Sequence, residues 1–211
     1  MTTTPAPLSV FLLRHAETAY NAAGNRIGGR SPQLPLSENG QAQASACALR
    51  LHEQGLHFDG IFCSTAVRTR ETLRILLETC PSLCTSAPVF TDALQELSQG
   101  AWEGRLRSEI YTPERLAEIN SNNWLFKAPG GESQREVEMR MLSFLQETAA
   151  HHPSGNYLII GHGCTFKCLL RGILGTPPAD TYKMKIANCE LIHLVLLSEK
   201  GWTLELPTRF F

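Results

Sequence analysis

The amino-acid sequence predicts an α/β fold, a three-layer α/β/α sandwich with a mostly parallel central sheet. Short apolar runs alternate along the chain with segments whose apolar residues recur at helical spacing. Strands that alternate with helices favour parallel pairing through right-handed crossovers. The chain has 211 residues, of which 43% are hydrophobic, and this is enough for one full core. We therefore expect a single domain over residues 1–211.

The N-terminal half is predicted to contain two strand–helix units. In order, these are a strand over 9–13, a helix from the N-cap Ser37 to about Glu53, a strand over 59–63, and a helix from about Ala66 to Cys80. Gly55 and Pro81 mark the ends of the two helices. Ala42, Ala46 and Leu49 share one face of the first helix.

The C-terminal half is predicted to continue this alternation after an irregular excursion. A short strand over 89–90 leads into the excursion, residues 91–131, which we expect to form a lid with one or two short helices. The remaining elements are a helix that opens with the capping box Ser133–Glu136, a strand over 157–160, a helix over 165–172, and strands over 187–197 and 203–206.

The charge balance and the cysteines exclude several classes of protein. The formal net charge is −1, which argues against a nucleic-acid or membrane partner held by bulk electrostatics. The chain opens without a basic, apolar leader, and no apolar run approaches about 20 residues, so we expect a cytoplasmic protein. The seven cysteines are scattered without zinc-type spacing, so we expect reduced thiols and no metal or other cofactor.

Three of the predicted strands run directly into arginine or histidine. Arg14-His15 follows the first strand, Ser64–Arg68 follows the second, and Gly161–Gly163, with a central histidine, follows the strand over 157–160. Ligands of open α/β sheets bind at the carboxyl ends of parallel strands, so these side chains should converge. Two arginines with two histidines favour a phosphate group, and hence a small phosphorylated metabolite as partner.

His15 is the candidate nucleophile of this site. The adjacent Arg14 stays charged and lowers the pKa of the imidazole, which keeps a nitrogen lone pair free near neutral pH. A neutral imidazole beside a phosphorus atom can attack it and form a phosphohistidine. Arg68 would stabilise the charge that builds up on the phosphoryl oxygens. His162, flanked by glycines before a helix, would bind the same ligand.

A departing alkoxide needs a proton, and two carboxyl groups qualify as its donor. Glu96 and Glu103 both lie in the stretch 94–104. A carboxyl group must be partly desolvated to hold its proton near pH 7. The residues alone do not choose between the two.

Six motifs, in this order, are similar to those of a known family. They are Leu13–Thr18 with Asn21, Pro35–Gly40, Ser64–Thr72, Glu96–Gly104, Pro129–Ser133 and Gly161–Gly163. The chain resembles the histidine phosphatase superfamily, in its phosphoglycerate-mutase-like branch, over most of its length. One departure is Ala16, which stands where the family usually has glycine. We expect its methyl group to restrict access to the nucleophile.

The resemblance implies a role for each residue of the site. His15 would be the phosphorylated nucleophile. The phosphate pocket would consist of Arg14, Asn21, Arg68, His162 and Gly163. The resemblance selects Glu96 as the general acid, which would later activate water, and gives Glu103 a structural role in a Trp-Glu-Gly turn. It implies a phosphomonoesterase that works without metal.

Two alternatives concern phosphoryl transfer by another route. Mutases of this branch resemble one another in an Asn-Glu-Arg stretch around the acid and carry additional basic residues. The stretch here is Gln95–Gly100, which lacks that arginine, so hydrolysis is favoured. A cysteine-based phosphatase needs five residues between cysteine and arginine. Cys63 and Arg68 are separated by four residues, and Cys164 and Arg171 by six, so neither pair fits.

The third alternative is a non-catalytic module that only binds a phosphorylated ligand. Loss of His15 or Glu96 would indicate such a module, and both are present. The substrate stays open between sugar phosphates, a ribazole phosphate and broad specificity, which we expect residues 22–33 and 105–127 to decide. The apolar strand over 191–197 would lie either in the centre of the sheet or at an edge that pairs the subunits of a homodimer.

Overall fold

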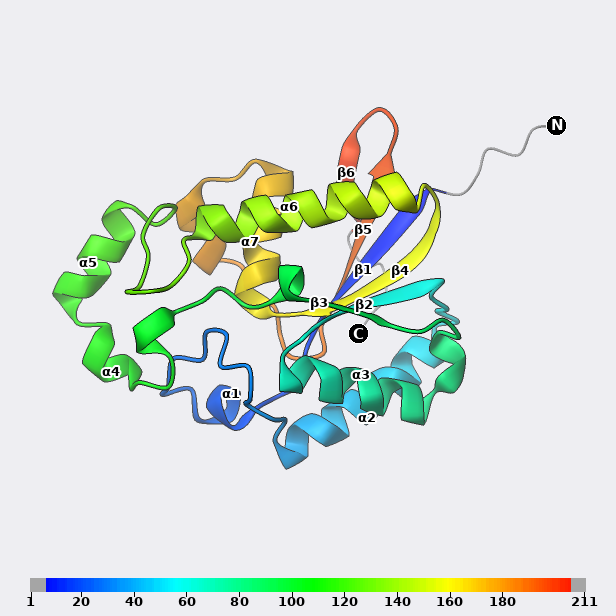
Figure 1. Ribbon diagram of the computed structural model, residues 1–211, viewed down its shortest axis with the longest axis horizontal. Coiled ribbons are helices and arrows are strands. Elements are labelled where there is room, and N and C mark those ends of the chain that lie inside the picture. Colours follow the sequence, from blue (N-terminus) through cyan, green and yellow to red (C-terminus); the bar gives the residue numbers. More distant parts are fainter. Residues whose placement is uncertain (1–6, 206–211) are drawn as a thin grey trace.

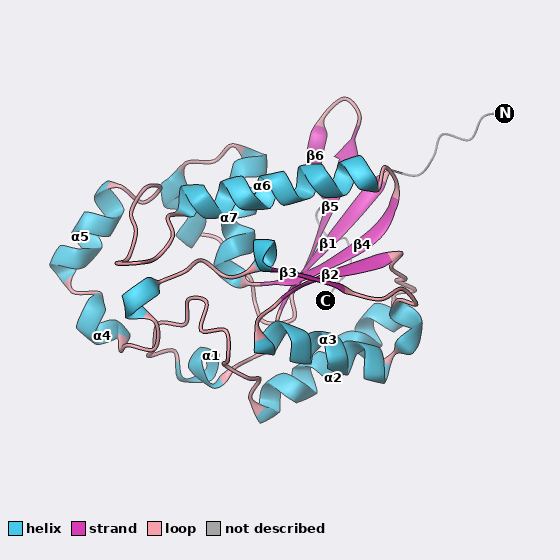
Figure 2. Cartoon of the chain, viewed as in Figure 1, coloured by secondary structure: helices cyan, strands magenta, loops and turns pink. Residues whose placement is uncertain are grey.

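A six-stranded sheet lies between two layers of helices in the computed structural model, which describes residues 7–205 (Figures 1 and 2). The strands are β1 (Leu8–Arg14), β2 (Gly60–Ser64), β3 (Val89–Thr91), β4 (Gly155–Gly161), β5 (Leu191–Leu197) and β6 (Gly201–Glu205). This arrangement confirms the predicted sandwich. The last residue of the predicted strand over 203–206, Leu206, lies outside the described residues.

The helices follow the predicted alternation with the strands. They are α1 (Ala19–Ala23), α2 (Glu38–Glu53), α3 (Val67–Thr79), α4 (Arg107–Ile110), α5 (Pro113–Ser121), α6 (Gln134–His151) and α7 (Gly163–Leu174). Short 3₁₀ helices span Pro81–Leu83, Asp92–Leu94, Gly100–Trp102 and Pro178–Tyr182. Ser37 caps α2, and Ser133 with Glu136 forms the predicted capping box of α6.

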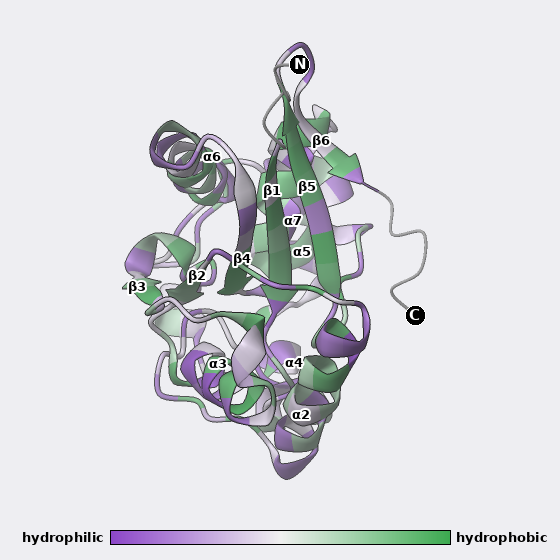
Figure 3. Cartoon of the chain, turned by 90° about the vertical axis from the view of Figure 1, so that its right-hand side faces the viewer, coloured by the Kyte–Doolittle hydropathy of each residue, from purple (hydrophilic) through white to green (hydrophobic). Residues whose placement is uncertain are grey.

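The strand order is β3-β2-β4-β1-β5-β6. The first four strands in this order are mutually parallel, whereas β5 and β6 are antiparallel to their neighbours. The sheet is therefore mostly parallel, as predicted. Strand β5 lies between β1 and β6, so the alternative that places it at an edge for pairing between subunits is wrong. Both β1 and β5 are hydrophobic along most of their length (Figure 3).

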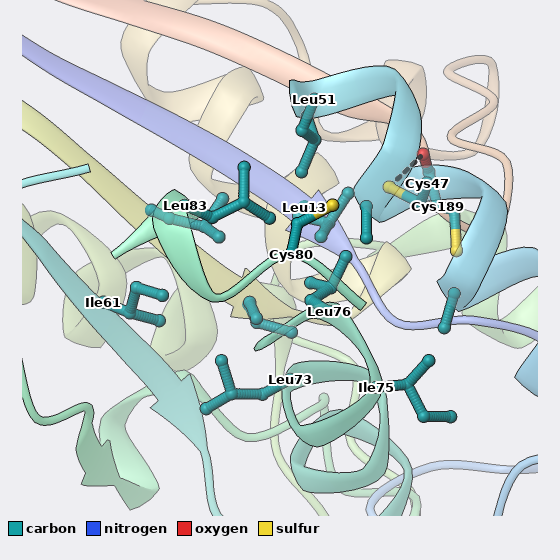
Figure 4. Packing of buried hydrophobic residues seen from close by; sticks show 14 of the residues in the cluster. Leu13, Cys47, Leu51, Ile61, Leu73, Ile75, Leu76, Cys80, Leu83 and Cys189 are labelled. Atoms are coloured by element: carbon teal, nitrogen blue, oxygen red, sulfur yellow. Dashed lines mark hydrogen bonds between the residues drawn. The ribbon is translucent and has the colours of Figure 1, made fainter. Parts of the chain in front are cut away.

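Successive residues of β1 face opposite layers because side chains alternate along a strand. Leu8, Val10 and Leu12 pack with the α6 and α7 layer. Phe11 and Leu13 pack with the α2 and α3 layer on the other face. Leu73 and Leu76 of α3 lie in this second core together with Leu13 (Figure 4). Because β1 to β4 are parallel, their carboxyl ends lie at the same edge of the sheet, between the two helical layers.

Two predicted features differ from the structure. The face of α2 that carries Ala42, Ala46 and Leu49 is exposed, because the helix instead packs through the face that carries Ala44 and Leu51. The strand predicted over 187–197 begins only at Leu191. Residues 187–190 form a turn, in which the Cys189 N–H donates to the Arg14 carbonyl at 3.1 Å and so fixes the end of β1.

The excursion over 91–131 contains α4, α5 and two of the 3₁₀ helices, in line with the expected short helices. It shares a small core with the loop that carries Ile27, formed by Ile27, Trp102 and Ala128 with Phe126 against it. Gly100 has a positive φ of 48°, and a Cβ there would lie 2.1 Å from the Pro129 carbonyl oxygen. The excursion thus closes on itself through a contact that only glycine allows. None of the helices in the described chain has the length and apolar character needed to cross a membrane.

Candidate active site

The strand ends converge because of the register between β1, β4 and β2. Arg14 pairs with Gly161 across β1 and β4, and Cys63 pairs with Ile160 across β2 and β4. The residues that follow therefore leave the sheet side by side. The rings of His15 and His162 lie edge to face with centroids 5.3 Å apart. The predicted convergence of these two histidines is present in the structure.

The His15 ring is fixed in one orientation. Its side chain is 4% exposed, and Nδ1 lies 2.7 Å from the Ala16 carbonyl oxygen, which can only accept a hydrogen bond. Nδ1 therefore carries the proton and Nε2 has the lone pair. The Nε–H of Arg68 donates to Nε2 at 3.3 Å. Burial, with the charges of Arg68 and Arg14, holds the pKa of His15 well below its ordinary value.

His162 is fully buried and has one free ring nitrogen. Its Nε2 lies 2.8 Å from the Ser64 hydroxyl, whereas no described group bonds to the buried Nδ1. When the hydroxyl donates to Nε2, Nδ1 carries the proton and can donate to an anion. Burial and the charge of Arg68 hold the pKa of His162 well below its ordinary value. His162 is therefore a neutral donor next to His15.

The two predicted arginines have different environments. Arg14 donates through Nη1 to the Ile186 carbonyl at 2.7 Å, while its buried Nε has no partner among the described residues. Arg68 is 3% exposed, and its two terminal nitrogens donate to carbonyl oxygens of residues 29–31. Arg68 thus also fastens the loop over the site, a role that the sequence analysis did not predict.

A mostly polar cavity of about 260 Å³ opens above His15. Its lining includes four arginines, and Glu96 is the one acidic residue among the described residues that line it. Those arginines are Arg14, Arg26, Arg68 and Arg107. The sequence analysis did not assign Arg26 and Arg107 to the site, although both fall in segments expected to decide specificity. The excess of positive charge fits an anionic ligand.

The two carboxylates that the family resemblance separates occupy different places. Glu96 lines the cavity, and its Oε1 accepts from the backbone and hydroxyl of Thr165 and from the Leu97 N–H, each at 2.9 Å. Its Oε2 accepts from the Cys164 N–H at 3.1 Å. Glu96 therefore caps the N-terminus of α7.

Glu103 instead ties two loops together away from the cavity lining. Its carboxylate accepts from the backbone N–H groups of Arg30, Ser31 and Gln99 at 2.9–3.0 Å. This arrangement supports the structural role that the family resemblance implies for Glu103.

Three further residues of the prediction have the following positions. Asn21 lines the cavity, and its Oδ1 accepts from Thr18, so its amide nitrogen is the group it can offer to a ligand. Gly163 packs behind Arg14, where a Cβ would lie 3.2 Å from Nε. Ala16 is fully buried in the core cluster with Leu13. The expectation that its methyl group restricts access to His15 is therefore wrong.

Residues outside the predicted set hold the loop that carries His15 in place. The Asn188 amide donates to the His15 carbonyl at 2.9 Å, and the Ala16 N–H donates to the Thr72 hydroxyl at 3.1 Å. A Cβ at Gly40 would lie 2.0 Å from the Glu17 carbonyl oxygen, so α2 can begin against this loop only with glycine there. Asn188 has no local sequence signal, since it lies in an ordinary turn.

The buried neutral histidines predict a pH-dependent stability. Unfolded histidine binds a proton below about pH 6.5, whereas folded His15 and His162, with lowered pKa values, do not. The unfolded state then binds more protons, so stability falls as pH falls below this value. With two such groups, the free energy of unfolding falls by up to about 3 kcal/mol for each pH unit.

Denaturant titrations between pH 7 and pH 5.5, in phosphate-free buffer, would measure this slope. His162→Gln should reduce this slope by about half, because the unfolded and folded states then differ by one bound proton instead of two. Replacement of the exposed His151 by Gln serves as the control. An unfolding free energy that stays constant over this range in the wild-type protein would contradict the neutral state of the two histidines.

This site has arginines and histidines at the ends of parallel strands, beside a carboxylate. Such a site is typical of α/β proteins that bind phosphate groups. The sequence model of the histidine phosphatase superfamily (branch 1) matches residues 10–208. The chain is 34% identical over 208 residues to a protein of Yersinia enterocolitica named probable phosphoglycerate mutase GpmB, and the match covers 94% of this chain and 91% of that protein.

Solved structures show the same fold at lower identity. The alpha-ribazole phosphatase from Shigella flexneri superposes with a TM-score of 0.79 at 22% identity, over 96% of this chain and 97% of that one. A mycobacterial glucosyl-3-phosphoglycerate phosphatase gives 0.79 at 24% identity, over 94% and 97%. The chain belongs to the histidine phosphatase superfamily, branch 1, whose members are phosphatases or mutases.

Proposed function

We propose that this protein is a phosphomonoesterase that transfers the phosphoryl group of a small metabolite to His15 and then to water. The observation that carries the proposal is the state of the His15 ring. Its Nδ1 proton is held by the Ala16 carbonyl, so the ring lone pair is on the buried, unprotonated Nε2, where it accepts a hydrogen bond from Arg68. The free Nε of Arg14 and Nδ1 of His162 are donors suited to phosphate oxygens.

The first step forms a phosphohistidine. The Nε2 lone pair of His15 forms the N–P bond while the P–O bond to the alcohol breaks. The leaving oxygen takes the bond pair and the proton of the Glu96 carboxyl group. Arg14 and Arg68 stabilise the charge on the transferring phosphoryl oxygens. The hydrogen bond from Nδ1–H to the Ala16 carbonyl stabilises the imidazolium that results.

The second step returns the phosphoryl group to water. The Glu96 carboxylate accepts a proton from water while the water oxygen attacks phosphorus. The N–P bond breaks, its electron pair returns to Nε2 of His15, and inorganic phosphate leaves. Glu96 is then protonated again and the starting state is restored.

The test of this function uses p-nitrophenyl phosphate in the presence of a chelator. Nitrophenol should be released, and enzyme quenched during turnover should contain an acid-labile, base-stable phosphoryl label. Chelator-sensitive hydrolysis, or hydrolysis without any such label, would contradict the mechanism.

A phosphoglycerate mutase is the second candidate, because a relative at 34% identity is named a probable one. A mutase would return the phosphoryl group to a second hydroxyl and would need a bisphosphorylated compound to prime His15. Incubation with 3-phosphoglycerate separates the two. Release of inorganic phosphate supports the phosphatase, whereas isomerisation without release supports the mutase.

The outer part of the cavity supports a substrate with a second anionic group. Two arginines of the excursion are paired, Arg105 with Glu109 and Arg115 with Glu118. Arg107 has no such carboxylate partner among the described residues, and neither has Arg26, yet both line the cavity. The Arg107 N–H donates to the carbonyl of residue 25 at 2.8 Å, which holds the two segments together.

Arg107→Met should therefore discriminate between two substrates that differ only in a carboxylate. We expect kcat/KM for O-phosphoserine to fall by about 10- to 100-fold, as for the loss of a hydrogen bond to a charged group. The value for O-phosphoethanolamine should change by less than about threefold. Arg115→Met is the control. Equal changes for both substrates would exclude a carboxylate site at Arg107.

A further inference from the structure

The candidate acid Glu96 lies on a stretch without regular secondary structure. The chain leaves the 3₁₀ helix Asp92–Leu94 and reaches the next one only at Gly100. Such a stretch has no helix or sheet ladder to define the position of its backbone. Its position must therefore come from other contacts, and the structure shows that three charged side chains provide them.

Arg140, on α6, holds the backbone before Glu96. Its Nη1 donates to the Ala93 carbonyl at 2.7 Å, and its Nη2 donates to the Gln95 carbonyl at 2.6 Å. Two backbone carbonyls on either side of one residue are thus bound by one planar guanidinium group. Lysine could not reproduce this forked geometry.

Glu132 holds the backbone after Glu96 and orients Arg140. Its Oε2 accepts from the Ser98 N–H at 3.1 Å, and its Oε1 accepts from Arg140 Nε at 3.2 Å. Burial raises the pKa of Glu132, but the hydrogen bonds and charge of Arg140 outweigh this and the pKa is lowered. Both side chains are 19% exposed, so the pair is well shielded from water.

Arg30 connects this pair to the phosphate pocket. Its Nη2 lies 2.9 Å from Glu132 Oε1, and its Nε donates to the Glu96 carbonyl at 3.4 Å. Its own carbonyl accepts from Arg68 Nη1 at 2.8 Å. One continuous set of contacts therefore joins the backbone of the acid to the arginine that bonds to His15.

We propose that Glu132, Arg140 and Arg30 are positioning residues that fix the spacing between Glu96 and the phosphate pocket. The inference rests on the proposed function, because it acts through Glu96 as the acid and Arg68 as the phosphate-binding group. A displacement of about 1 Å in a reacting group can cost roughly 100-fold in rate. The carboxylate–guanidinium contacts thus act on the chemical step without touching the substrate.

The test compares two leaving groups in single-turnover phosphorylation of the enzyme. Glu132→Gln should slow phosphorylation by glycerol 3-phosphate about 10- to 100-fold, since alkoxide departure needs a well-placed acid. Phosphorylation by p-nitrophenyl phosphate, whose leaving group needs little protonation, should slow by less than about threefold. A merely structural role would slow both reactions equally. Arg74→Met, which breaks an exposed ion pair on α3, is the control.

A double-mutant cycle provides the second readout. In the Glu96→Gln background, Glu132→Gln should have little further effect on either substrate, because the group it positions is absent. If Glu132→Gln does not fold, Arg30→Met is used to test the positioning role instead. The Arg30 side chain is 36% exposed, so its replacement disturbs little packing. Arg30→Lys should recover part of the loss, because it keeps the charge that faces Glu132.

The possible failures are distinguishable. Equal slowing with both substrates, or additive effects in the Glu96→Gln background, would overturn the positioning role while the phosphatase stands. Equal slowing of both substrates by Glu96→Gln itself would remove the acid assignment and the positioning role with it. Hydrolysis that does not depend on His15 would overturn the proposed function.

Discussion

His15→Ala is expected to reduce hydrolysis of p-nitrophenyl phosphate by a factor on the order of 10⁴–10⁶, as for loss of other enzymatic nucleophiles. The reason is geometric. Nε2 of His15 is the one described ring nitrogen that has both a fixed tautomer and a place in the cavity lining. Water would have to replace it without the covalent intermediate that divides the reaction into two steps.

The same variant should still bind phosphate, which separates loss of chemistry from loss of the site. Arg14, Arg68 and His162 remain, so phosphate at 100 times its dissociation constant should stabilise the variant by about 2.7 kcal/mol. Thermal unfolding with and without phosphate measures this. Replacement of the exposed His151 by Ala is the matched control for activity. A His15→Ala protein that keeps its activity, or that still acquires the acid-labile label, would refute the nucleophile assignment.

Glu96→Gln is expected to have the second largest effect, and a selective one. Phosphorylation of the enzyme by an alkyl phosphate should slow by about 10²- to 10⁴-fold, which is the usual contribution of a general acid. Phosphorylation by p-nitrophenyl phosphate should slow much less, because p-nitrophenolate leaves without a proton. Dephosphorylation also needs Glu96, so the phosphoenzyme should accumulate after a burst of nitrophenol.

The substitution tests chemistry more than folding. The amide oxygen of glutamine can keep the three hydrogen bonds that Oε1 of Glu96 accepts, and only the bond from the Cys164 N–H is lost. Glu103→Gln is the matched control. It should cost about 1–3 kcal/mol of stability, since a partly buried backbone N–H group loses its acceptor oxygen, without any dependence on the leaving group. If Glu103→Gln showed a dependence on the leaving group and Glu96→Gln showed none, Glu103 rather than Glu96 would be the general acid.

The strand ends were predictable from the sequence because each is a local signal. An apolar run that stops at arginine or histidine indicates both the strand and the ligand-binding edge, and Arg14, Ser64 and His162 are placed accordingly. The capping box of α6 is equally local. The face of α2 was not predictable in this way, because small residues on both faces give little contrast in hydrophobicity.

The supporting contacts could not be read from the sequence. Arg30 is distant along the chain from Glu132 and Arg140, which lie just before and on α6, and it meets them only in the folded protein. Charged residues in loops and on helices are ordinarily solvated, so their pattern carries no signal of burial. The residues alone left the choice between Glu96 and Glu103 open for the same reason, and only the family resemblance favoured Glu96. In the structure Glu96 lines the cavity, whereas Glu103 joins two loops.

The hydrogen bonds of Glu96 to the start of α7 tie this carboxylate to a helix, and in the proposed mechanism it is also the proton donor. Every proton that it gains during turnover weakens its hold on those amides, and every proton that it gives up restores it. Selection for a more rigid α7 would therefore favour a permanently charged residue 96 and slow the enzyme. If Glu96 is the acid of the proposed mechanism, heat resistance and turnover rate are opposed at this position.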